Sequence, residues 1–308
     1  MYPGNCCYIK QWDVVGCSSL GTNNMSVKVL TFNICHSAVL AMPSNGLSEV
    51  ARIIAESGCD VCAIQEADGK ACPTCKEHGV RQADKGGIML ELFCLLSSSL
   101  EWSQGHVATG ACILSRFPIE AETVLQGDGK SHGSVVVRTP CGHRLLVYNV
   151  HLDWQHQPQI ALRQNHGIKT HEMVAREWIT RGPEVMALLA DSQHRCRGMD
   201  CSLLVGDFNT QSHLDEIRPS EPLWPVTHAL QRHGFEDAFR TVYPDPVLHP
   251  GCTWYVPLPC YDMSSEAHGR LDYVFVKGDA VRVHVAEVKH RKPWPSDHKA
   301  LLVALTIE

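Results

Sequence analysis

Leu203-Leu204-Val205-Gly206-Asp207-Phe208-Asn209 is a short apolar run that ends abruptly on a carboxylate and, two positions later, on a carboxamide. Residues 201–205 predict a buried strand, and Gly206 permits a sharp exit from it. Asp207 and Asn209 are therefore left at the end of the strand, where side chains can leave the core. Taken alone, such an ending fits an ordinary turn equally well, so the other strands decide between the two interpretations.

Other predicted strands carry polar residues at comparable positions. Three of them end on such residues, which are Asn33 after 27–32, Glu66 after 60–65, and Asn149 with His151 at the end of 144–150. Two later strands begin with them, since Asp272 opens 271–277 and the pair Asp297 and His298 precedes 300–307. If neighbouring strands are antiparallel, all of these side chains meet at one edge of the sheets.

The residue types brought together in this way favour a hard divalent cation. Glu66, Asp207, Asp272 and Asp297 offer carboxylate oxygens, which repel one another unless a cation or protons neutralise them. A set of oxygen donors suits Mg²⁺ or Mn²⁺, whereas a thiolate zinc site would need cysteine ligands. The two histidines add acid and base groups near neutral pH, and the combination fits hydrolysis at phosphorus.

The ordered set of segments resembles the endonuclease/exonuclease/phosphatase superfamily, whose fold is shared with DNase I. The matching segments are residues 31–34, 64–66, 113–119, 149–152, 206–209, 270–273 and 296–298. The resemblance covers residues 26–308 and implies one catalytic domain, with residues 1–25 as an irregular extension. It also implies an α/β fold: a four-layer sandwich of two packed mixed or antiparallel sheets with helices outside.

The resemblance also implies a role for each matching residue. Glu66 is expected to be the main metal ligand, with Asn33 beside it and Asp297 on the far side of the ion. One or two Mg²⁺ or Mn²⁺ ions are compatible with the sequence. Asn149 and Arg116 are further candidates for contact with phosphate.

The remaining matching residues are expected to carry the catalytic steps. Asp207 would position or activate the attacking water, and Asn209 would hold the water and the phosphate. His298, oriented by Asp272, would act as acid or base at the scissile phosphate. His151 would stabilise the charge that develops on the phosphate oxygens.

The match with the superfamily has gaps that bear on the substrate. Position 35 is a cysteine where some members carry a second acid, so a second metal position is less well supported. The tryptophan before the Gly-Asp pair and the Cys-Asp-Arg segment of the inositol polyphosphate 5-phosphatases are absent from the sequence. The substrate is therefore expected to be a phosphate ester whose organic part is left open.

Composition and missing motifs exclude several other functions. The net charge of −6 over 308 residues argues against a broad basic surface for non-specific nucleic-acid binding, although not against a local groove. No apolar stretch reaches the ~20 residues of a membrane span, and the first 24 residues lack the apolar core of a signal peptide. Neither a P-loop nor a Gly-x-Ser-x-Gly turn is present.

Fifteen cysteines, an odd number, occur in the chain. Cys62, Cys112 and Cys201 lie in apolar runs, which favours free thiols in a reducing, cytoplasmic compartment over a disulfide framework. Cys72 and Cys75, with His78 close behind, form the kind of pair that can hold zinc, but no second ligand pair follows at zinc-site spacing. We expect a monomer.

The rest of the chain predicts helices over 47–57, 86–97 and 226–232, and two helical stretches within 159–192 that Gly182 and Pro183 separate. Strands are expected at 110–115, 134–138 and 281–288, and a long ordered loop at 243–269. Arg163, Lys169, Arg176 and Arg181 fit either phosphate contacts or a solvated helix face.

Three tryptophans lie beside the motifs, at positions 154, 254 and 294, and fit either stacking on a base or packing of the loops. The main hypothesis is a divalent-metal-dependent phosphoesterase. One alternative is a nuclease acting on DNA or RNA. An alternative of another class is a catalytically silent module that binds a phosphorylated ligand or a protein.

Overall fold

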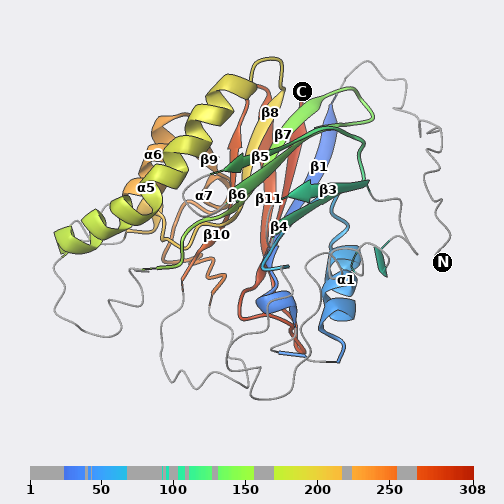
Figure 1. Cartoon of the computed structure of the whole chain (residues 1–308), viewed down its shortest axis with the longest axis horizontal. Coiled ribbons are helices and arrows are strands. Elements are labelled where there is room, and N and C mark those ends of the chain that lie inside the picture. The colour runs from blue at the N-terminus through green and yellow to red at the C-terminus, as the bar shows by residue number, and fades with distance from the viewer. Residues whose placement is uncertain are drawn as a thin grey trace.

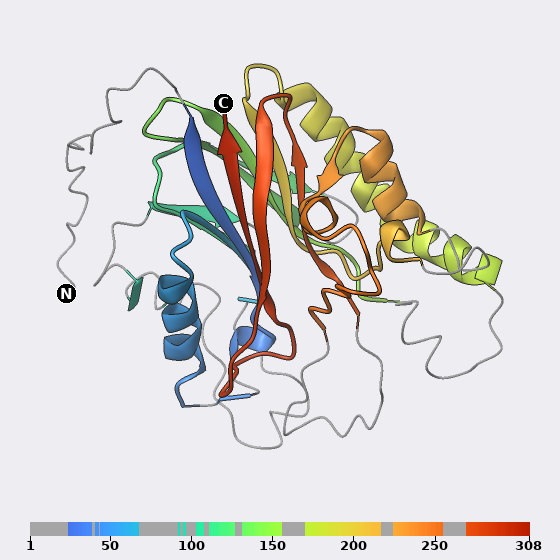
Figure 2. The same cartoon turned by 180° about the vertical axis from the view of Figure 1, so that it is seen from behind.

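Two six-stranded sheets form the centre of the molecule in the computed structural model (Figures 1 and 2). The structure describes residues 24–38, 41–42, 44–67, 92, 95–96, 103–107, 111–126, 131–155, 170–216, 224–254 and 269–308. Sheet A has the strand order β11-β12-β1-β2-β4-β3, and sheet B has the order β5-β6-β7-β8-β10-β9.

The strands of sheet A are β1 (Met25–Asn33), β2 (Val61–Gln65), β3 (Ser103–Val107), β4 (Ala111–Ser115), β11 (Val281–Lys289) and β12 (Ala300–Ile307). Those of sheet B are β5 (Ile119–Gln126), β6 (Ser131–Arg138), β7 (Arg144–His151), β8 (Cys201–Asp207), β9 (Glu236–Asp237) and β10 (Asp272–Lys277). The pairs β1/β2 and β7/β8 are parallel, whereas all other pairs in the two sheets are antiparallel. Both sheets are therefore mixed, as predicted.

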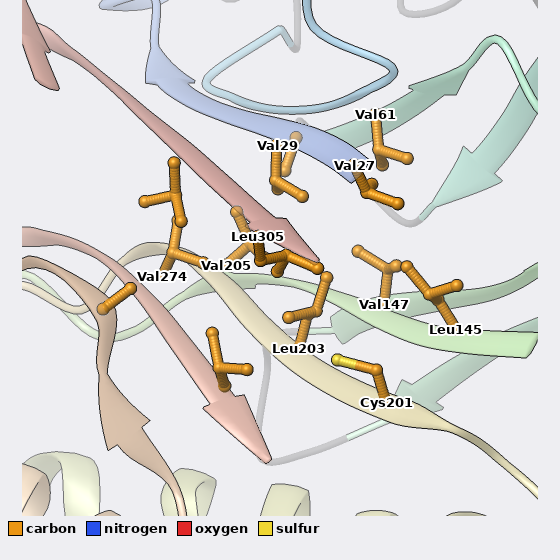
Figure 3. Close-up of a cluster of buried hydrophobic side chains, with 14 of the residues drawn as sticks. Val27, Val29, Val61, Leu145, Val147, Cys201, Leu203, Val205, Val274 and Leu305 are labelled. Atoms are coloured by element: carbon orange, nitrogen blue, oxygen red, sulfur yellow. The ribbon is translucent and has the colours of Figure 1, made fainter. Parts of the chain in front are cut away.

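The main core lies between the two sheets. Figure 3 shows Val27 and Val29 of β1 facing Leu145 and Val147 of β7, with Leu203 of the neighbouring strand β8 beside Val147. These side chains are fully buried, and alternate residues along each strand point inward because successive strand side chains face opposite sides. Packing of the two inner faces therefore follows directly from the period-two pattern of the sequence.

Helices cover the outer face of each sheet. Helix α1 (Gly46–Ser57) packs Val50 and Ile54 onto sheet A. Helices α5 (Thr170–Arg195) and α6 (Pro225–Arg232) pack onto sheet B through Leu188 and Leu230, among others. Short helical segments complete the described elements: η1 (His36–Ala38), η2 (His213–Asp215) and α7 (Ala238–Val242). The order helix, sheet, sheet, helix confirms the four-layer prediction (Figures 1 and 2).

Most of the predicted elements are present, and one prediction is wrong. Helix α5 continues through Gly182 and Pro183, so the two helical stretches expected within 159–192 are not separated there. Pro183 removes one backbone donor, whose usual acceptor is the carbonyl of residue 179. Both Ile179 and Pro183 lie on the exposed face of the helix, where water can replace the missing hydrogen bond.

Strands β3 and β5 and helix α7 were not predicted. The predictions for residues 1–23, for most of the helix over 86–97, for Cys72, Cys75 and His78, and for Arg163 and Lys169 lie outside the described residues. Residues 255–268, which make up half of the loop predicted over 243–269, lie outside them as well.

Cysteines of the described segments form no disulfide, and Cys62, Cys112 and Cys201 are buried, as the apolar runs indicated. Within the described segments, no helix is both long enough and apolar enough to cross a membrane.

Candidate active site

Three polar side chains stand in one row across the end of sheet B. Parallel pairing places His151 of β7 opposite Asp207 of β8, and antiparallel pairing places Asp272 of β10 opposite the same Asp207. Gly206, one residue earlier, lets β7 approach β8, because a side chain there would come within 1.8 Å of the carbonyl oxygen of Val150. The strand pairing and the missing side chain at Gly206 thus bring His151, Asp207 and Asp272 together.

Sheet A brings its polar residues to the same edge. Asn33 ends β1, and Glu66 follows the last residue of the parallel neighbour β2. Four of the non-glycine residues with a positive φ lie here: Cys35 (43°), His36 (47°), Glu66 (58°) and Asn209 (51°). Such left-handed backbone is disfavoured for side chains with a Cβ and tends to gather at functional sites.

Asn33 joins the two sheets. Its amide Nδ2 donates to Glu66 Oε1 at 3.0 Å and to Asp207 Oδ2 at 3.0 Å, and its Oδ1 accepts from the backbone N–H of Cys35 at 3.0 Å. Asn33 is fully buried, so these bonds fix the two carboxylates relative to each other.

His298 lies against both carboxylates of sheet B. Its Nδ1 is 2.9 Å from Asp272 Oδ2, and its Nε2 is 3.7 Å from Asp207 Oδ2. Burial lowers the pKa of the imidazole, but the carboxylates of Asp272 and Asp207 outweigh this effect and raise the pKa well above its usual value. The ring of His298 is thus held in one orientation by Asp272.

His151 approaches the cluster from the opposite side. Its Nε2 lies 3.7 Å from Asp207 Oδ2 and 4.0 Å from Glu66 Oε1. Asp207 Oδ2 is therefore flanked by two imidazole nitrogens at equal distances, and it also accepts from Asn33. This carboxylate oxygen, with one amide donor and two imidazole nitrogens close by, is the centre of the site.

Glu66 remains ionised at this position. Burial raises the pKa of its carboxyl, but His151, His36 and the hydrogen bond from Asn33 outweigh burial and bring the pKa down to about 2. The backbone N–H of His36 donates to Glu66 Oε2 at 2.9 Å. A permanently charged carboxylate at the rim of the site is the expected property of a cation ligand.

Asp297 and Asn209 complete the site on two sides. Trp254 Nε1 donates to Asp297 Oδ2 at 3.3 Å, and Asn209 Nδ2 donates to the carbonyl of Leu152 at 2.9 Å. The backbone N–H of Asn209 donates to Asp207 Oδ1 at 2.8 Å, which locks the turn after β8. The structure thus gathers eight of the ten predicted site residues at one edge: Asn33, Glu66, His151, Asp207, Asn209, Asp272, Asp297 and His298.

Arg116 lies at the other end of sheet A, away from the residues gathered around Asp207, and the phosphate contact predicted for it stays a prediction without support from this position. Strand β4 runs antiparallel to β2, so Ser115 pairs with Val61 at the start of β2, whereas Glu66 follows the end of β2. Arg116 contacts Asp60 there, through its backbone N–H at 2.7 Å and its guanidinium at 3.4 Å.

Asn149 is buried beneath the site, a position that gives no support to the contact with phosphate predicted for it. Its Nδ2 donates to the carbonyls of Ile64 and Cys112, both at 2.8 Å, and its Oδ1 accepts from Gln65 Nε2 at 2.8 Å. With no exposed surface and both amide hydrogens engaged, Asn149 ties β7 to sheet A.

Two tryptophans serve the packing of the site. Trp294 is buried against Phe32, with ring centroids 5.2 Å apart, and Trp254 holds Asp297. Trp154, three residues after His151, is 62% exposed and keeps a ring face available for stacking. Of the two alternatives in the sequence, packing applies to Trp254 and Trp294, and stacking remains open only for Trp154.

His36 and Glu177 lie near the site and were not predicted from the sequence, whereas two alternatives were left open for Arg181. His36 lies against Glu66, with its Nδ1 3.9 Å from Oε2. Arg181 and Glu177 of α5 are fully buried behind β8, so Arg181 forms no part of a solvated helix face. Thr210 donates to Glu177, which connects α5 to the turn that carries Asn209. A buried charged pair on a helix has no local sequence signal, because its burial is decided by the sheet beneath it.

A two-sheet sandwich with carboxylates and imidazoles gathered at one edge is the architecture of the DNase I-like class. The model of the Endonuclease/Exonuclease/phosphatase family matches residues 30–298. The chain belongs to this family. An uncharacterized protein of Caenorhabditis elegans, F14F9.5, is 26% identical to it over 94% of each chain.

Solved structures share the fold at low sequence identity. An endonuclease/exonuclease/phosphatase from Beutenbergia cavernae is 19% identical, with a TM-score of 0.61 over 92% of this chain and 72% of the other. Truncated TDP2 of Caenorhabditis elegans is 18% identical, with a TM-score of 0.56 over 92% and 98%. The catalytic domain of human Nocturnin, solved with a bound sulfate anion, is 15% identical, with a TM-score of 0.58 over 92% and 95%.

Proposed function

We propose that the protein is a divalent-metal-dependent hydrolase of phosphate esters. The observation that carries the proposal is the arrangement around Asp207 Oδ2, which lies between His151 Nε2 and His298 Nε2, at 3.7 Å from each.

The donor set fits a divalent cation. Glu66 carries its charge at neutral pH, Asp297 lies on the neighbouring loop, and Asn33 holds Glu66 in place. Glu66 and Asp297 would hold the ion. When bound, such an ion supplies charge to neutralise phosphate oxygens and to lower the pKa of water.

Asp207 has the position of a general base or water-orienting group. It is 1% exposed, and its two oxygens are already oriented by the amide of Asn33 and the backbone N–H of Asn209. A water between this carboxylate and the substrate would be held in one direction, which is the main contribution of such a group to attack on phosphorus.

His298 and His151 have complementary positions. His298 is held at Nδ1 by Asp272, which leaves Nε2 to donate a proton toward the phosphate or its leaving group. His151 is partly exposed and not held in this way by a described side chain, so it suits a hydrogen bond to a charged phosphate oxygen.

Nuclease activity is the second candidate within the same chemistry. Trp154 supports it, because an exposed indole beside the site can stack on a base. The catalytically silent binding module stays the alternative of another class. The monomeric state and the cytoplasmic location expected from the sequence remain predictions.

Hydrolysis of bis(p-nitrophenyl) phosphate and p-nitrophenyl phosphate in the presence of Mg²⁺, Mn²⁺ or Zn²⁺ tests the proposal. We expect turnover that EDTA abolishes and that Asp207→Ala lowers by about 100-fold or more, while Arg116→Ala retains it. Full activity in Asp207→Ala would show that the active site has been assigned to the wrong residues. Binding of phosphorylated ligands without turnover under any of the three metals would instead support the silent module.

Substrate identity requires a panel rather than a single compound. Single-stranded DNA, RNA, a lipid phosphodiester and sugar or inositol phosphates cover the classes that the sequence leaves open. A preference for nucleic acid that Trp154→Ala weakens would establish the nuclease alternative, because base stacking contributes about 1 to 3 kcal/mol.

A further inference from the structure

The contact between Asp272 and His298 joins the two sheets. Asp272 is the first residue of β10 in sheet B, whereas His298 lies two residues before the start of β12 in sheet A. Strand pairing within either sheet does not set the 2.9 Å distance between Asp272 Oδ2 and His298 Nδ1. This distance therefore depends on the segments that connect the start of β10 with the turn before β12.

Thr253 and Trp254 form such a connection. The hydroxyl oxygen of Thr253 accepts from two backbone N–H groups, that of Asp272 at 3.1 Å and that of the preceding residue at 3.0 Å. The carbonyl of Thr253 accepts from the backbone N–H of Lys299 at 2.6 Å, and Trp254 pairs with His298 in an isolated antiparallel bridge. Two neighbouring residues are therefore bonded to the backbone on both sides of the contact.

The segment that carries Thr253 is anchored on its other side. The guanidinium of Arg240, a buried residue, donates to the carbonyls of His249 at 2.7 Å and of Pro250 at 3.4 Å. Asp215 in turn accepts from Nε of Arg240 at 2.7 Å. Thr253 itself is fully buried, so any displacement would leave buried polar groups without partners. Its position is thus fixed by contacts that do not involve the site.

We propose that Thr253 is a positioning residue that sets the distance between Asp272 and His298. Its hydroxyl fixes the backbone of the residue that orients the imidazole, and its carbonyl fixes the backbone directly after the imidazole. A misplacement of about 1 Å in such an arrangement can lower a rate by about 100-fold. The inference rests on the proposed function in assigning proton transfer to His298, and it deepens that function by naming a residue that places this histidine.

Matched variants at Thr253 test the inference. Thr253→Val keeps the shape of the side chain and removes the oxygen that accepts the two N–H groups, whereas Thr253→Ser keeps this oxygen. Thr253→Cys, with a weaker acceptor in the same place, is the milder second variant if valine prevents folding. Thr139→Val is the control, because Thr139 is also buried and accepts from the backbone N–H of His143 at 3.0 Å, at the other end of sheet B.

Hydrolysis of bis(p-nitrophenyl) phosphate and of diphenyl phosphate with Mg²⁺ gives the first readout. Phenolate is a more basic leaving group than p-nitrophenolate, so its departure depends more on a proton from His298. We expect Thr253→Val to lower kcat for diphenyl phosphate by about 10- to 100-fold and to lower kcat for the nitrophenyl ester less. Thr253→Ser and the control should retain both activities. In the His298→Ala background Thr253→Val should have no further effect, because it acts through this histidine.

Proton NMR gives a second readout that does not need turnover. Asp272 accepts at Nδ1 of His298, so the proton on Nδ1 lies in a hydrogen bond to a buried carboxylate and should give a low-field imidazole signal. Its loss in His298→Ala identifies the signal. We expect Thr253→Val to move it upfield, while Thr253→Ser and the control leave it in place.

Three results would overturn the inference: an equal loss of kcat on both esters, a further loss in the His298→Ala background, or an unmoved signal in Thr253→Val. The two proposals fail differently. A signal that moves in Thr253→Val, when the parent hydrolyses no ester, upholds the placement of His298 by Thr253 and contradicts the proposed function. Metal-dependent hydrolysis that Thr253→Val leaves unchanged does the reverse.

Discussion

At the scale of single residues, the site depends on how each carboxylate is held. Asp207 accepts hydrogen bonds at both oxygens, from Asn209 and from Asn33, before any substrate is present. Glu66 is kept ionised by the imidazoles beside it, with a pKa of about 2 despite its burial. Groups that are oriented in advance have little to reorganise during a reaction, which is the main source of their effect.

His298→Ala should lower kcat/KM by about 100- to 10,000-fold, because in the proposed function this residue is the positioned proton carrier. The matched control is His284→Ala, which changes an exposed histidine of β11 that contacts Thr306. Steady-state kinetics on the generic phosphodiester give the comparison. Equal losses in the two variants would show that the effect does not come from the site.

Glu177 should make stability depend on pH. Burial raises the pKa of its carboxyl to about 7, although Thr210 and Arg181 act in the opposite direction. Between about pH 4.5 and 7 the folded chain therefore binds this proton more strongly than the unfolded chain, and stability falls as the pH rises. Above pH 7 the loss should reach about 3 kcal/mol.

Urea unfolding of Glu177→Gln at pH 5 and pH 8 measures this contribution. We expect the variant to lose less stability between the two pH values than the parent. Glu172→Gln, in the exposed first turn of the same helix, should behave like the parent. An unchanged pH dependence in Glu177→Gln would contradict the assignment.

At the scale of elements, the close contact of β7 and β8 depends on a missing side chain. Gly206 has φ of 149°, and a Cβ there would lie 1.8 Å from the carbonyl oxygen of Val150. Gly206→Ala should cost about 3 kcal/mol or more in unfolding free energy. Gly142→Ala, at φ of 90° with open space around it, should cost only about 1 to 2 kcal/mol. Similar losses of unfolding free energy in the two variants would show that backbone strain, and not the clash with Val150, causes the destabilisation.

Element types could be predicted from the sequence where the periodic pattern is strong, as in β1, β8 and α1. The continuous helix α5 could not, because Pro183 normally ends a helix and only its exposed position allows the helix to pass through it. Strand β5 alternates small, charged and apolar residues at the edge of sheet B, and this pattern is weak until β6 pairs with it.

At the scale of the whole molecule, the sequence predicts that the site lies at one edge of the sheets. It does not predict which side chains contact one another there. The rule that polar residues at the carboxyl ends of strands meet at one edge holds for Glu66 and Asp207. Arg116, whose phosphate contact was implied by the resemblance and not by this rule, lies at the other end of the sheet because β4 runs in the opposite direction. The rule fails for Asn149, which lies two residues before His151 and is fully buried between the sheets, because the sequence does not encode this depth.

Asn149→Ala should reduce stability without removing chemistry. It breaks three hydrogen bonds between β7 and sheet A in a region that water does not reach, at about 1 to 3 kcal/mol for each group left unpaired. Thermal unfolding should occur at a lower temperature, while kcat/KM of the folded fraction stays near that of the parent. A selective loss of kcat at unchanged stability would instead support a contact between Asn149 and the phosphate.

Sheet B is built from one continuous length of chain, β5 to β10, whereas sheet A combines β1 to β4 with β11 and β12. During synthesis β1 must wait for β12, its antiparallel partner, while sheet B is already complete. His298 arrives with that last strand, long after Asn33 and Asp207. A chain emerging from the ribosome can therefore have a complete sheet B and still lack His298 at the site. Any activity would come only from molecules in which β12 has paired with β1.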